Sequence, residues 1–187
     1  LTKTVEGLEK ALPAITKAVE SGRKVLFVGT KKQVKEVVRE AAESVKQPYV
    51  VERWVGGMLT NSATVNQQIK KLKTLEKRMD SGELAKRYSK LEVQRYAEEI
   101  ESLNTKYGGI KDLMGRPGIL FVTDAIADAN AIREAKTLNI PVVAIVDTNV
   151  NPDGIDYVIP ANDDAIKGVK LLLDYAIEAI KEAKTDK

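Results

Sequence analysis

The sequence predicts an α/β protein, with a parallel sheet covered by helices on both faces and interrupted once by a long helical insertion. Short apolar, β-branched runs alternate with amphipathic segments of helical length over most of the 187 residues, as they do in chains of consecutive β-α-β units. Between residues 63 and 107 this alternation stops, and two apolar stripes with helical spacing take its place.

The first part of the chain contains two expected strands, each preceded by a helical segment. The run at 24–29 is short, apolar and ended by Gly29, which is typical of a buried parallel strand. Valine and alanine recur on one face of the segment that follows it. The expected elements are a helix over about residues 2–21, a strand at 24–29, a helix over 33–44 and a strand at 49–51.

The same alternation resumes after the insertion. Two apolar runs enclose an amphipathic segment, and a short strand and a long helix close the chain. The expected elements are a strand at 119–123, a helix over 127–137, strands at 142–146 and 157–160, and a helix over 163–183. Right-handed crossovers then favour a three-layer, flavodoxin-like domain with five parallel strands in the order 2-1-3-4-5.

The insertion is expected to be an antiparallel helical hairpin that projects from the sheet. Its first stripe falls within 64–79 and its second, which has heptad spacing, within 90–107. Ser89 and Glu92 have the spacing of a capping box that opens the second helix. The prediction divides the chain into an α/β domain (1–62 and 108–187) and a coiled-coil hairpin (63–107), with Ile69, Leu72, Ile100 and Leu103 in its seam.

Composition excludes several classes of function. The chain has no cysteine and no histidine, which removes disulfides, thiol nucleophiles, histidine relays and the usual zinc sites. No apolar run approaches the length of a membrane span. We therefore expect a cytoplasmic protein that is not an enzyme and carries no cofactor, catalytic residue or metal ligand.

Charge is unevenly distributed along the chain. Residues 63–90 hold eight basic and three acidic side chains, whereas 108–187 hold nine basic and thirteen acidic ones. A surface that binds a polyanion is therefore expected on the first two thirds of the chain rather than the last.

Polar residues follow the ends of several expected strands. Thr30, Lys31 and Lys32 come after the first strand, but without the glycine spacing of a phosphate-binding loop. One interpretation is a plain turn in which Thr30 caps the next helix, and the other is a phosphate site at a helix N-terminus. Aspartates after the later strands, with Asp163 and Asp164 before the last helix, are expected to form turns and caps.

Residues 53–61 read Arg-Trp-Val-Gly-Gly-Met-Leu-Thr-Asn and contain the only tryptophan of the chain. The guanidinium group of Arg53 could form bidentate hydrogen bonds with phosphate or base edges, and Trp54 could stack on a base. The alternative is a tight turn with Trp54 in the core, since tryptophan is usually well buried.

Five segments together resemble the bacterial small-subunit ribosomal protein S-two family. They are residues 25–33, 53–61, 117–141, 140–149 and 156–166, in the family's order. The resemblance implies a structural ribosomal protein that binds ribosomal RNA (rRNA), contacts neighbouring small-subunit proteins and helps to recruit ribosomal protein S-one.

Family members begin with a segment that contains His-x-Gly-His. This sequence starts at Leu1, inside an expected helix, and has no histidine. We therefore expect that such an N-terminal segment is missing.

The residues expected to face RNA come from two sources. The first set matches motif positions, and the second rests only on the positive charge of the hairpin, for which a solvated helix face is an equal alternative. The motif set is Lys31, Lys32, Arg53, Trp54, Thr60 and Asn61; the hairpin set is Lys70, Lys71, Lys73, Lys77 and Arg78.

Two other classes of function compete with this interpretation. The first is an enzyme that binds phosphate or nucleotide in a crevice at Thr30, Asp124 and Thr148. The second is a protein scaffold that docks through the hairpin. RNA binding should weaken steeply with salt, whereas docking through an apolar seam should not.

Overall fold

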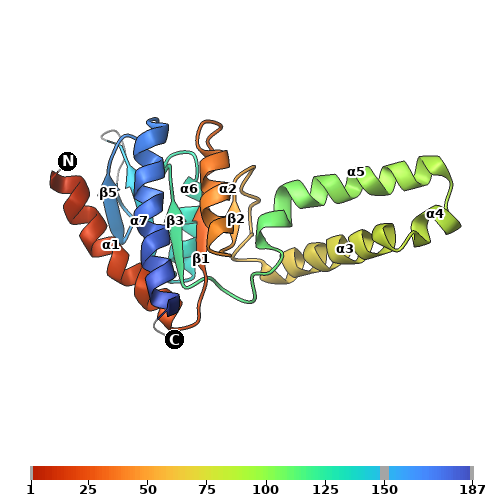
Figure 1. Cartoon of the computed structure of the whole chain (residues 1–187), viewed down its shortest axis with the longest axis horizontal. Helices are drawn as coiled ribbons and strands as arrows, with labels where there is room; N and C mark the ends of the chain where they lie inside the picture. Colours follow the sequence, from red (N-terminus) through yellow and green to blue (C-terminus); the bar gives the residue numbers. More distant parts are fainter. Residues whose placement is uncertain (1, 148–151, 186–187) are drawn as a thin grey trace.

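The computed structural model describes residues 2–147 and 152–185 of the chain. It has a compact α/β part and a long arm that projects from one side (Figure 1). The elements of the α/β part are α1 (Thr2–Glu20), β1 (Val25–Val28), α2 (Lys35–Ser44), β2 (Tyr49–Val50), β3 (Ile119–Val122), α6 (Ala129–Thr137), β4 (Val142–Val146), β5 (Tyr157–Pro160) and α7 (Ile166–Thr185).

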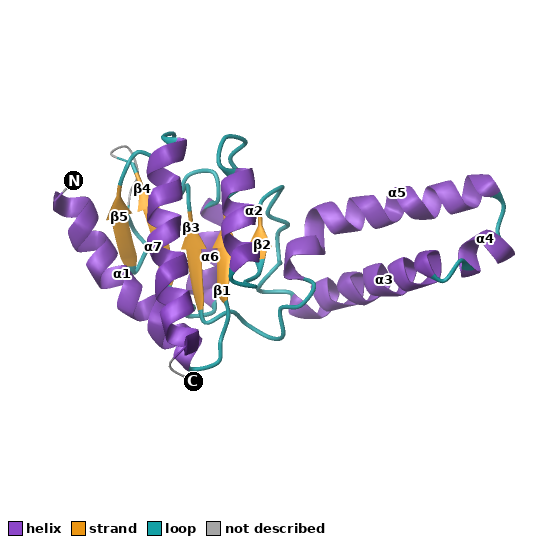
Figure 2. Cartoon of the chain, in the orientation of Figure 1, coloured by secondary structure: helices purple, strands orange, loops and turns teal. Residues whose placement is uncertain are grey.

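The sheet has the predicted topology. Its five strands are all parallel and lie in the order β2-β1-β3-β4-β5, side by side in Figure 2. Every residue of β1, β3 and β4 is buried, which explains why these strands are continuous apolar runs without a polar face. Their carboxyl ends therefore lie at one edge of the sheet.

Alternate residues of the strands feed two separate apolar cores, one on each face of the sheet. Phe27 and Phe121 point to the core formed with α1, α2 and α7, and their rings lie 5.5 Å apart. Leu26 and Leu120 point to the other core, which α6, the loop after β2 and the base of the arm complete. This arrangement confirms the three-layer architecture.

The arm consists of two antiparallel helices, α3 (Ser62–Asp80) and α5 (Lys90–Tyr107), and it leads back to the sheet through a short 3-10 turn, η1 (Gly108–Ile110). Leu72 and Leu103 are buried between the helices, Ile69 is buried in the same core, and the half-buried Ile100 packs against it. The Ser89–Glu92 capping box is confirmed at the start of α5.

Some local predictions were wrong. A short helix, α4 (Glu83–Arg87), lies at the tip of the arm, between the two predicted helices, where no element was expected. The second helix begins at Lys35 and its N-terminus has no side-chain cap. Thr30 is therefore not a helix cap; its hydroxyl donates to Asp128 instead, at 2.7 Å.

Candidate nucleic-acid interface

The loop after β2 is held by one carboxylate from α6. Glu134 accepts hydrogen bonds from the indole N–H of Trp54 (3.1 Å) and from the backbone N–H of Gly57 (2.7 Å), both on Oε1. Its other oxygen, Oε2, accepts from the backbone N–H groups of Leu59 (2.9 Å) and Thr60 (3.1 Å) and from the Thr60 hydroxyl (3.2 Å). The segment from Trp54 to Thr60 thus wraps around a single side chain.

These bonds decide the charge state of Glu134. Partial burial acts to raise the pKa of its carboxyl, but the N–H groups of Leu59, Trp54, Gly57 and Thr60 outweigh it, and the pKa is lowered. Hydrogen bonds to the charged form have this effect. Glu134 therefore stays ionised at neutral pH, and the loop surrounds a fixed negative charge.

The side chains of this segment divide into inward and outward ones. Trp54 is 8% exposed and packs in the core that includes Met58 and Leu59. Arg53 and Asn61, at the two ends of the segment, are exposed. The Thr60 side chain is exposed too, but its only hydroxyl hydrogen is donated to Glu134. The exposed polar side chains that make no bond to Glu134 therefore lie at the two ends of the loop.

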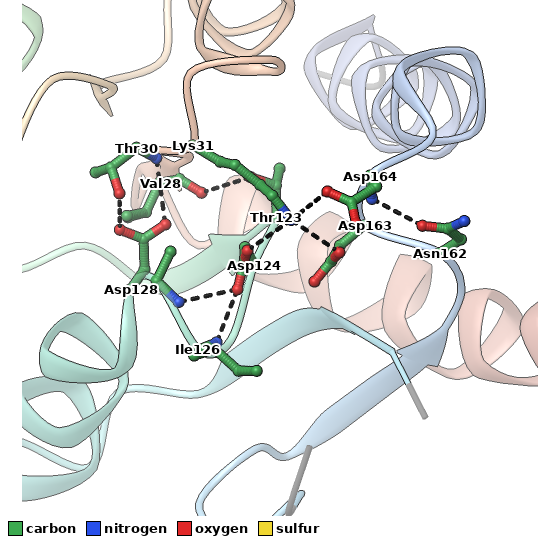
Figure 3. Close-up of polar contacts among 11 residues, drawn as sticks. Val28, Thr30, Lys31, Thr123, Asp124, Ile126, Asp128, Asn162, Asp163 and Asp164 are labelled. Carbon is green, nitrogen blue, oxygen red and sulfur yellow. Dashed lines mark hydrogen bonds and ion pairs between the residues drawn. The ribbon is translucent and has the colours of Figure 1, made fainter. Parts of the chain in front are cut away.

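Lys31 lies in an acidic cluster at the carboxyl edge of the sheet (Figure 3). Its ammonium contacts Asp164 at 2.7 Å, Asp163 at 3.0 Å and Asp124 at 3.2 Å. The hydrogen bond to Asp164 raises the pKa of Lys31, those to Asp163 and Asp124 add to it, and burial opposes them. Three carboxylates thus already surround this ammonium.

Asp128 lies in the same cluster and is bound to the turn after β1. It accepts from the backbone N–H and the hydroxyl of Thr30, at 3.3 and 2.7 Å. Burial raises the pKa of Asp128 to about 6, although the Thr30 bonds act the other way. The carboxyl edge is thus a set of internal contacts between loops.

In the ranges 2–147 and 152–185 no group of three or more acidic side chains has the arrangement of a metal site. Of the three residues expected to line a crevice, Thr30 bonds to Asp128 and Asp124 to Lys31, while Thr148 lies outside the described residues.

The five cations predicted on the arm fall into two groups. Lys71 pairs with Glu99, Lys73 with Asp112 at 3.3 Å, and Arg78 with Glu83 at 3.4 Å. Lys70 and Lys77 are exposed on α3. In the part of the chain that the structure describes, these two lysines pair with no carboxylate.

Lys32 and Arg53 share this property. Both are exposed and, among the described residues, neither pairs with a carboxylate. Lys32 follows β1 and Arg53 follows β2, and since these strands are parallel neighbours, both residues lie at the same corner of the sheet. Among the residues predicted to face RNA, we call Lys32, Arg53, Lys70 and Lys77 the unpaired cations.

No helix within the described ranges is long and apolar enough to cross a membrane.

The predicted set of RNA-facing residues contains exposed, unpaired cations, cations held in ion pairs, and one buried tryptophan.

Comparison with known proteins identifies the family. The family model of ribosomal protein S2 matches residues 1–183. The chain is 50% identical to the small ribosomal subunit protein uS2 of Tolumonas auensis over 184 residues, which cover 98% of this chain and 76% of that protein. It is 46% identical to the uS2 protein of Bacteroides thetaiotaomicron over 191 residues, covering 100% of this chain and 68% of that protein.

The chain belongs to the ribosomal protein S2 family. Members of this family are structural proteins of the ribosome and not enzymes, which agrees with the absence of cysteine and histidine from this sequence. The family assignment confirms the resemblance that the five motif segments carry.

The role of one residue, Glu134, which holds the loop after β2, was not predicted from the sequence. Glu134 is part of the motif at 117–141, but its partners lie 74–80 positions earlier in the chain. A signal was present: Glu134 adjoins the buried face of α6, made by Ala131, Ile132 and Ala135. A carboxylate that such a position partly buries needs hydrogen-bond partners.

Proposed function

We propose that this chain is a structural constituent of the small ribosomal subunit that binds rRNA and supports translation in the cytoplasm. The observation that carries the proposal is the set of unpaired cations at the corner of the sheet and along α3. Lysine and arginine that are not neutralised by carboxylates are the side chains available to phosphate groups, and phosphate contacts supply much of the affinity for nucleic acid.

The remaining predicted residues have graded roles in this proposal. Lys31, Lys71, Lys73 and Arg78 are held in ion pairs, so phosphate would have to compete with a carboxylate for each of them. Asn61 is exposed at the other end of the loop from Arg53, and its side-chain amide can form hydrogen bonds with sugar or base edges. Trp54 and Thr60 shape the loop through Glu134.

The arm extends the proposed RNA surface away from the sheet (Figure 1). We treat 63–107 as a module separate from the α/β domain of 1–62 and 108–187, because α3 and α5 pack against each other and project from the sheet. A projecting arm reaches RNA that the compact domain alone does not.

Neighbouring small-subunit proteins, with ribosomal protein S-one among them, are the second class of partner in this proposal. The acidic last part of the chain, with thirteen acidic and nine basic residues in 108–187, suits protein contacts better than RNA contacts.

Co-sedimentation with small ribosomal subunits tests the proposal. The test variant replaces the four unpaired cations, Lys32, Arg53, Lys70 and Lys77, by alanine. The matched control removes four exposed lysines from α1 and α7, namely Lys10, Lys17, Lys170 and Lys181.

Both variants lose the same charge, so a difference between them reports location. The proposal predicts that the test variant is largely absent from the subunit fraction while the control sediments like the parent. Equal sedimentation of all three proteins would place the RNA surface elsewhere.

A further inference from the structure

We propose that Glu134 is a positioning residue that holds the segment Trp54–Thr60 in a preformed shape for rRNA. The inference rests on the proposed function, because it assigns a role within the same RNA surface. Glu134 itself carries a negative charge and would not touch phosphate. It acts through the loop whose two ends present Arg53 and Asn61.

The loop is built in a way that makes an external support necessary. Gly57 has a φ of +84°, and Gly56 is exposed with no atom within 4 Å of where a Cβ would stand. Glycine loses more conformational freedom on ordering than any other residue. Two adjacent glycines would therefore leave this segment with many accessible shapes if nothing held them.

Glu134 supplies the support from outside the loop. Five hydrogen bonds, three of them from backbone N–H groups, converge on its two oxygens. The carboxylate is itself fixed, because it stands on α6, whose Ala131, Ile132 and Ala135 are buried. The shape of the loop is thus set by a helix that follows it in sequence by more than 70 residues.

The same geometry excludes one other role for the loop. Converging backbone N–H groups often form a site for a phosphate group, but here the Glu134 carboxylate already occupies that position. Phosphate contacts must therefore come from side chains at the ends of the segment. A preformed segment binds more tightly because less ordering entropy is lost on association.

The substitution Glu134→Gln separates positioning from simple charge. The variant loses one negative charge, so electrostatic attraction alone predicts tighter binding to RNA. Positioning predicts weaker binding, because the glutamine amide presents an NH₂ group to backbone N–H donors. Glu178→Gln on α7 is the matched control, since Glu178 is exposed and changes the net charge equally.

The experiment measures binding of the full chain to small-subunit rRNA at several salt concentrations, together with thermal melting. We expect Glu134→Gln to bind about tenfold more weakly, which corresponds to about 1.4 kcal/mol, with the same log–log salt slope as the parent. The slope stays because no phosphate contact is removed. Glu178→Gln should bind like the parent. Unchanged or tighter binding by a folded Glu134→Gln protein would overturn the inference.

Two additions keep the test decisive. If Glu134→Gln does not fold at the assay temperature, Glu134→Asp replaces it: the charge is kept, but the carboxylate is one methylene shorter, and binding should again weaken. Hydrogen exchange of the Gly57 and Leu59 amides is measured without RNA. Faster exchange in the variant supports positioning, and unchanged exchange contradicts it, even if the parent shows no salt-dependent RNA binding and the proposed function itself fails.

Discussion

Two adjacent glycines at the root of the arm should respond in opposite ways to the same substitution. A Cβ added at Gly109 would stand 2.1 Å from the backbone oxygen of Tyr49 and 2.7 Å from its ring. A Cβ at Gly108 would meet only the flexible side chain of Asn104, at 3.2 Å. Because Tyr49 belongs to β2, Gly109 marks the point at which the base of the arm packs against the sheet.

The expected magnitude follows from these distances. A carbon–oxygen contact is normally about 3.3 Å or more, so Gly109→Ala forces η1 and β2 apart by roughly 1 Å. Overpacking of this kind costs typically 1–3 kcal/mol, and a helical alanine returns up to about 1 kcal/mol over glycine. Because the Tyr49 contact is so close, the cost at Gly109 should lie at the upper end, and about 3 kcal/mol less about 1 kcal/mol leaves a net loss of about 2 kcal/mol. Gly108→Ala should be neutral or slightly stabilising.

Urea denaturation followed by circular dichroism measures the difference. With a slope of about 2 kcal/mol per molar urea, the midpoint for Gly109→Ala should fall by about 1 M, while that of Gly108→Ala should not fall. Equal urea midpoints for the two variants would refute the view that close contact between Gly109 and the Tyr49 backbone holds the arm against the sheet.

Two further predictions concern the buried aspartate and the arm. The pKa of Asp128 is raised from 3.8 to about 6, so the stability that its protonated form contributes is complete only below about pH 3 and is lost as the pH rises through 6. The loss is about 3 kcal/mol, and the stability of Asp128→Asn relative to the parent should rise by that amount from about pH 3 to pH 7 in urea titrations. A difference that is constant with pH would contradict the assignment. Leu72→Asp combined with Leu103→Asp should abolish the helical signal of the arm but leave a cooperative melt of the α/β part, as followed by circular dichroism. A single transition at much lower temperature would show that the arm is not a separate module.

The fold was accessible from the sequence because it depends on patterns that repeat locally. Fully buried parallel strands must be apolar throughout, and the runs at 25–28, 119–122 and 142–146 are. The arm followed from the 3-4 spacing of its apolar residues. The short helix Glu83–Arg87 was missed because only one of its residues, Leu84, is buried, too few to produce a period.

The site was accessible only in part, because its decisive contacts join distant positions. Lys31 meets Asp163 and Asp164 from 132 residues away or more, and no local pattern pairs them. Trp54 illustrates the same limit. Its neighbours in sequence allowed either stacking or burial, and Glu134, 80 residues later, receives its indole N–H in the folded chain.

The salt dependence of binding to isolated small-subunit rRNA tests the central claim most directly. Each lost phosphate contact should reduce the log–log slope by about 0.7–0.9. Replacing Lys32, Arg53, Lys70 and Lys77 by alanine should therefore flatten the slope by about 3 if all four contact phosphate. The α1 and α7 control should keep the slope of the parent. If the two variants show the same slope as the parent, the unpaired cations do not contact RNA phosphate, and the account is contradicted.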